Sequence, residues 1–249
     1  MTELISGRLR RWVRARGASP LLTYYGLATG ERTELSGVSV ANWVDKTSNL
    51  LADELGVGVG DQVELALAER DPGHWVTLVW QLACWQVGAT VTLGRRSAAT
   101  VVVVGPNEPT AAAPGASVLV CSLHPLGLPL AEPPAAGVLD YALEVRAQPD
   151  QHTSLPQSGL ALAWHDQTRQ LSQADLLTGD VTDQRRLIQP DDPWTTTRAG
   201  LLAPLLGGGS SVVVAGQAQP EQLARIAGQE RADLPAGGAT AVPAADQEP

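Results

Sequence analysis

A strand, a helix and a second strand follow one another between residues 63 and 93, and this order constrains the fold more than any other feature of the sequence. Residues 63–68 favour a short strand, and residues 73–87 carry apolar side chains at helical spacing. Gly88 supplies the flexible residue that ends a helix, and residues 91–93 begin the next strand. A unit of this kind joins parallel strands through a right-handed crossover. The sequence therefore predicts a parallel sheet.

Similar segments extend this pattern in both directions. The predicted helices are 4–16, 40–55 with Ser36 or Ser39 as its cap, 201–206, 221–231 and one after Ser172, which has Asp175 at capping-box spacing. The further predicted strands are 21–25 and 32–35 as a hairpin, 101–104, 118–121, 160–164, 169–171 and 212–215. Strand, turn, strand, serine cap and helix thus occur twice. The predicted fold class is α/β, a mostly parallel sheet flanked by helices.

Changes in composition suggest where the chain divides. Residues 106–114 and 125–134 are rich in proline, alanine and glycine, which predicts loops. We expect a first subdomain at 1–135 and a partial second subdomain at 136–231. Residues 232–249 bury too little apolar surface to order themselves, so they predict a disordered tail.

The charge balance argues against several partners. The net charge is −9, and Lys46 is the only lysine, so the clustered basic surface that nucleic acid needs is not expected. Helix 4–16 carries five arginines, and its apolar face either packs on its own domain or lies on lipid. No stretch approaches the roughly 18 apolar residues of a membrane span.

Cys84 and Cys121 form no CxxC pattern, which predicts reduced, buried thiols and a cytoplasmic protein.

Several chemical motifs can be excluded by their context. The glycine runs at 56–60 and 207–211 lie between a helix and a strand, whereas a phosphate cradle needs a helix to follow it. The four histidines lack metal-binding spacing, so no metal is expected. Three tryptophans recur every five residues, at 75, 80 and 85; at least two belong to the core, and Trp80 is the candidate for an exposed contact surface. No catalytic constellation can be argued from spacing.

A family resemblance rests on several longer runs. They are ELS at 34–36, ANWVDKTSNLL at 41–51, GVGVGDQV at 56–63, the segment 200–215 and the helix 220–231. Together they resemble the AMP-binding, adenylate-forming enzymes, which include the acyl-CoA synthetases. Within that superfamily the chain is most similar to a small, functionally uncharacterised actinobacterial family of truncated AMP-binding-like proteins of this length. The resemblance implies the first half of the large N-terminal domain of these enzymes.

The same resemblance implies what the chain lacks. A phosphate loop ending in Pro-Lys is expected just before Ser172, but only Ser158 and Gly159 remain as a degenerate cofactor-binding position, and Lys46 lies in the first core helix. The chain also ends before the regions that would supply the magnesium, ribose and lysine groups. The resemblance therefore implies a non-catalytic protein without a cofactor, which binds a small molecule or a protein partner. Two alternatives stay open: half of a two-chain adenylate-forming enzyme, and a nucleotide or acyl-CoA sensor.

Overall fold

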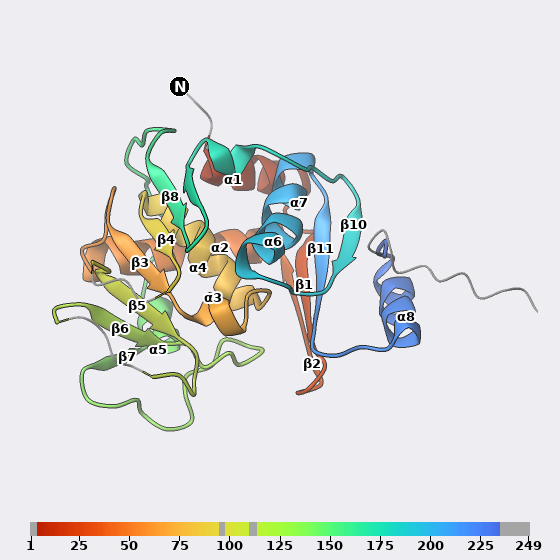
Figure 1. The fold of residues 1–249 in the computed structure, drawn as a ribbon, viewed down its shortest axis with the longest axis horizontal. Helices are drawn as coiled ribbons and strands as arrows, with labels where there is room; N and C mark the ends of the chain where they lie inside the picture. The colour runs from red at the N-terminus through yellow and green to blue at the C-terminus, as the bar shows by residue number, and fades with distance from the viewer. Residues whose placement is uncertain (1–3, 95–97, 110–113, 235–249) are drawn as a thin grey trace, which may run out of the picture.

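A seven-stranded sheet forms one half of the computed structural model, which describes residues 4–94, 98–109 and 114–234 (Figure 1). Its strand order is β7-β6-β5-β3-β4-β8-β9, and all neighbours are parallel except β8 and β9. The predicted strand–helix–strand unit is confirmed as β3, α4 and β4. The strands are β3 Gln62–Leu65, β4 Thr90–Thr92, β5 Val101–Val104, β6 Ser117–Val120, β7 Val138–Asp140, β8 Leu162–His165 and β9 Gln170–Ser172.

A four-stranded sheet brings the two ends of the described chain together. Its order is β10-β11-β1-β2, formed by β1 Pro20–Gly26, β2 Glu31–Ser36, β10 Arg185–Ile188 and β11 Ser210–Ala215. The predicted hairpin is β1 and β2, and β1 is also parallel to β11, with Leu22 opposite Ser211. The expected boundary at 135 lies between β6 and β7, which are neighbours in the seven-stranded sheet. The division into subdomains stays a prediction.

Within the described ranges, side-chain hydrogen bonds cap the start of four helices, and glycines with positive φ end two helices. The helices are α1 Ile5–Arg16, α2 Gly37–Asn49, the π-helical η1 Leu50–Glu54, α3 Leu67–Arg70, α4 Trp75–Val87, α5 Tyr141–Arg146, the 3₁₀ turn η2 Asp175–Leu177, α6 Pro193–Thr197, the π-helical η3 Arg198–Leu202, α7 Ala203–Gly207 and α8 Pro220–Glu230. Ser36 is the cap of α2, because its hydroxyl accepts from the Ser39 amide at 3.1 Å. Gly88 ends α4 with a φ of 87°.

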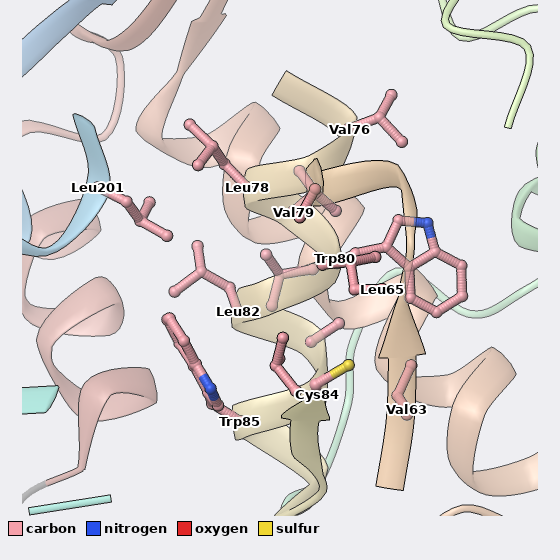
Figure 2. Close-up of a cluster of buried hydrophobic side chains, with 14 of the residues drawn as sticks. Val63, Leu65, Val76, Leu78, Val79, Trp80, Leu82, Cys84, Trp85 and Leu201 are labelled. Atoms are coloured by element: carbon pink, nitrogen blue, oxygen red, sulfur yellow. The ribbon is translucent and has the colours of Figure 1, made fainter. Parts of the chain in front are cut away.

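Helix α4 lies between the two sheets and contacts both of them (Figure 1). Each of its residues is buried. Figure 2 shows Trp80 directed toward β3, while Leu82 and Trp85 lie on the side of Leu201. The expectation that Trp80 is exposed is wrong: its exposed fraction is 0%. A helix enclosed by sheets and helices has no solvent-facing stripe, so tryptophans at scattered angles are all core residues.

Helix α1 is docked on its own domain. Its apolar residues Ile5, Leu9 and Trp12 are buried, and the Trp12 indole donates to the carbonyl of Gly209 at 2.8 Å. This packing favours the docked position of α1 over the alternative in which its apolar face lies on lipid. No helix of the described ranges is both long and apolar enough to cross a membrane.

Three sequence predictions need correction. The strand expected at 63–68 ends at Leu65, because the good helix formers that follow make α3. The helix expected after Ser172 is only the short turn η2. The predicted capping contact is present, because the Ser172 amide donates to the Asp175 carboxylate at 2.7 Å. The helix does not continue, since Gly179 turns the chain with a φ of 99°. The predicted tail starts too early, because Asp233 makes two backbone hydrogen bonds to β10. The rest of that tail, 235–249, lies outside the described residues.

Candidate functional site

Ser158 and Gly159, the predicted remnant of a phosphate loop, lie before β8 at its amino end. The Ser158 hydroxyl accepts from the amide of Leu160 at 3.1 Å, and the Gly159 carbonyl accepts from Ala174 at 2.8 Å. Both residues therefore help to hold the start of the β8–β9 hairpin. Ligands of parallel sheets usually bind outside the carboxyl ends of the strands. A role for this pair in ligand binding stays a prediction.

The turn between β8 and β9 occupies the carboxyl end of β8, just before Ser172. The Asp166 carboxylate accepts from the amides of Thr168 at 2.7 Å and Arg169 at 2.8 Å, and from the Trp164 indole at 2.8 Å. It also pairs with the Arg169 guanidinium at 2.9 Å. Burial raises the pKa of Asp166, but these hydrogen bonds outweigh it and hold the pKa below its usual value. The amides that could cradle an anion are thus already bound to a carboxylate.

A second carboxylate closes the adjacent helix end. Asp192 accepts from the amides of Trp194 at 3.1 Å and Thr195 at 3.2 Å, the first free amides of α6. It lies 3.9 Å from the Arg169 guanidinium, and the rings of Trp164 and Trp194 pack at 5.1 Å. The turn and α6 therefore form one connected unit. The sequence signals were present, as Asp-x-Thr is typical of a turn and Asp-Pro of a helix start.

A cleft of about 350 Å³ lies at the carboxyl ends of β1, β10 and β11. The segment between α3 and α4 forms its other wall. This segment approaches the sheet closely: a Cβ on Gly73 would lie 2.7 Å from Val213 and 2.8 Å from Pro190. The polar side chains of the lining are those of Tyr24, Thr29, Arg70, Asp71, His74 and Gln189.

Two titratable groups of this cleft have unusual surroundings. His74 is 2% exposed, and its Nδ1 accepts from the Val76 amide at 3.2 Å, which places the proton of the neutral ring on Nε2. Within the described residues Nε2 has no hydrogen-bond partner; Glu31 lies 3.8 Å away. Desolvation lowers the pKa of His74 to about 3, although the Leu123 backbone opposes it. Burial and the charge of Glu108 raise the pKa of Asp71.

The comparison with known proteins identifies the family. No protein-family model matches the chain. A Mycobacterium tuberculosis H37Rv protein described as a TIGR03089 family protein is 34% identical over 244 residues, covering 92% of this chain and 96% of its own length. The chain belongs to the TIGR03089 family.

Solved structures show that the chain has the fold of part of an acyl-CoA synthetase. A Brucella canis acyl-CoA synthetase superposes with a TM-score of 0.71 at 16% identity, over 93% of this chain and 47% of that one. The N-terminal domain of FACL13 from Mycobacterium tuberculosis gives 0.66 at 11% identity, over 93% and 62%. A benzoate CoA ligase from Burkholderia xenovorans gives 0.64 at 12% identity, over 90% and 48%. The chain thus spans about half the length of the first enzyme, and the predicted fold class is confirmed.

The single lysine and the two cysteines are engaged or buried in the structure. Lys46 donates to the carbonyl of Gln148 and pairs with Asp150 at 2.8 Å, so the single lysine links α2 to a distant segment. Cys84 and Cys121 are free and buried, and burial raises the pKa of each thiol. Among the residues that the structure describes, no group of three or more His, Cys, Asp or Glu could hold a metal ion.

Proposed function

We propose that this TIGR03089 family protein is a non-catalytic member of the adenylate-forming fold, and that it binds a small polar molecule. The observation that carries the proposal is Asp166. Its carboxylate accepts from two turn amides and an indole, so these donors are not free to bind a phosphate. A triphosphate at this turn would find these donors taken.

Electrostatics strengthen this argument. Asp166 and Asp192 lie 2.9 and 3.9 Å from the same guanidinium nitrogen of Arg169, so two negative charges stand close together here. Two like unit charges 4 Å apart repel by about 1 kcal/mol in bulk water and by about 4 kcal/mol near a protein surface. Arg169 offsets part of this repulsion, but it is already paired with Asp166 at 2.9 Å. We therefore infer that ATP binds poorly here and that adenylation does not occur at this turn.

The cleft beside His74 is the binding site that we propose. Its volume of about 350 Å³ suits a small molecule. The half-buried Asp71 carboxyl offers an acceptor in the cleft, and the buried, neutral His74 ring lies beside it. Glu31 and Glu108 add negative charge nearby, and the one arginine of the lining, Arg70, is paired with Glu108 at 3.2 Å. These groups favour a neutral or amine-bearing ligand over a phosphorylated one. The two buried free thiols support a reducing, cytoplasmic setting, and the net charge of −9 argues against nucleic acid as a partner.

Thermal-shift screening of the whole chain tests this proposal. We expect small amines to raise the melting temperature through Asp71, whereas ATP, AMP and CoA esters give no shift that depends on Asp71. A ligand at 100 times its Kd adds about 2.7 kcal/mol to the free energy of unfolding. Asp71→Asn should abolish the shift, and Asp180→Asn, at a carboxylate that is 96% exposed, is the matched control. A shift with ATP alone would instead favour a nucleotide sensor.

A further inference from the structure

A groove of about 500 Å³ lies at the amino ends of β1, β10 and β11, on the edge of the four-stranded sheet opposite to the cleft. The last turns of α1 and α8 form its sides. Trp12 and Pro20 give it an apolar wall. Because the groove and the cleft lie at opposite strand ends, binding in the groove does not depend on the function proposed for the cleft.

The groove has a charge opposite to that of the protein. Four arginines and two glutamates line it, an excess of two positive charges in a chain whose net charge is −9. The arginines come from four different elements or their ends. They are Arg16, Arg32, Arg185 and Arg231. Convergence of separate elements on one groove indicates a built surface rather than the solvated face of one helix.

A buried carboxylate fixes two of these arginines. The side chain of Glu230 is 7% exposed and accepts from Arg32 Nε at 2.9 Å and from Arg185 Nη2 at 2.7 Å. Tyr25 donates to the same carboxylate. Burial raises the pKa of Glu230, but these hydrogen bonds outweigh it and lower the pKa overall, so the carboxylate stays charged. The two guanidinium groups are therefore held in place before any ligand arrives.

The other two arginines are uncompensated. Neither Arg16 nor Arg231 has an ion pair or side-chain hydrogen bond within the described ranges. Arg231 also adopts a φ of 50°, the left-handed conformation in which glycine usually ends a helix. A side chain with a Cβ is strained there, so an arginine at this position has a cost that glycine would avoid.

We propose that this groove binds a phosphate group, either inorganic phosphate or the monoester of a small molecule. A phosphate monoester carries about −1.5 to −2 charges at pH 7, which matches the excess of two positive charges. The planar guanidinium forms paired hydrogen bonds with phosphate oxygens. The wall of Trp12 and Pro20 offers a surface to the organic part of a monoester. A long polyanion does not fit as well, because the rest of the protein is negatively charged.

Isothermal titration of the whole chain with inorganic phosphate, glycerol phosphate and glycerol tests the groove. We expect both phosphates to bind and glycerol not to bind. A glycerol phosphate affinity above that of phosphate identifies a monoester site, and equal affinities identify a site for phosphate itself. Failure of both phosphates to bind at about 10 mM would overturn the proposal.

Variants locate the binding. Arg231→Gly removes the guanidinium while keeping a residue suited to a positive φ, so the protein should fold, and Arg16→Gln removes the second uncompensated charge. Each should weaken phosphate binding about tenfold. Arg14→Gln is the matched control, since Arg14 is an exposed arginine of the same helix outside the groove. An equal loss in all three variants would show only an effect of total charge and would refute the site.

Discussion

Replacing Asp166 by alanine should destabilise the protein by roughly 3 kcal/mol. The substitution removes the acceptor of the Thr168 and Arg169 amides, a loss comparable to that of a helix cap and worth about 1 kcal/mol. It also leaves the indole N–H of Trp164, a residue with 0% exposure, without its partner, which costs about 1–3 kcal/mol. The ion pair with Arg169 adds little, because the Arg169 side chain is 37% exposed.

Urea unfolding followed by tryptophan fluorescence measures this loss of unfolding free energy, and thermal unfolding measures it as a fall in melting temperature. In a chain of this size the expected loss lowers the melting temperature by roughly 6–12 °C. Asp180→Ala is the control, because that carboxylate is 96% exposed and should change stability by less than about 0.5 kcal/mol. If Asp166→Ala unfolded like the Asp180 control, the carboxylate would not be closing the turn, and the reasoning about its amides would be refuted.

The pH dependence gives a second readout of the same group. The pKa of Asp166 is lower in the folded protein than in the unfolded chain, where it is about 3.9. Its charged form therefore stabilises the fold above about pH 4, and this contribution is lost as the pH falls through the folded pKa. The difference between the wild type and Asp166→Ala should shrink below about pH 4. A difference that grew on acidification would contradict the assignment.

Four further substitutions test the scaffold. Ser36→Ala should cost about 1 kcal/mol of unfolding free energy and Ser39→Ala less, because only Ser36 caps the helix amide; equal costs would refute the cap. Gly37→Ala should displace α1, since a Cβ there would lie 2.3 Å from the Trp12 ring; an unchanged near-ultraviolet circular dichroism spectrum would argue against this packing. Trp80→Ala should cost about 3–5 kcal/mol, and a loss below 1 kcal/mol would show that Trp80 is not core.

Long apolar segments made much of the fold predictable from sequence. The helix of the strand–helix–strand unit ends at Gly88, whose φ of 87° is the conformation that its position suggested. Short elements were missed because their side chains carry little pattern. Strand β10 begins with two arginines, and α6 spans only five residues, so neither has a recognisable period. Strand β10 is instead stabilised by pairing with β11. Helix α6 is held by more distant contacts, those of Trp194 with Trp164 and of Thr197 with Gln81.

The candidate sites were harder to predict for the same reason. Sequence comparison pointed to Ser158 and Gly159, whereas the structure places Asp166 and its amides at the carboxyl end of β8. The spacing of Asp166, Thr168 and Arg169 could have indicated an occupied turn. The groove could not have been predicted, because its four arginines come together only when α1, α8 and the four-stranded sheet pack.

The exchange of labelled pyrophosphate into ATP is the most direct test of the central proposal. The whole chain would be assayed with a panel of carboxylic acids and magnesium, beside an acyl-CoA synthetase as the positive control. We expect no exchange above the level without protein, because Asp166 occupies the amides of the turn. Exchange that depends on an added carboxylic acid would show that the protein forms acyl adenylates, and it would contradict the non-catalytic function proposed above.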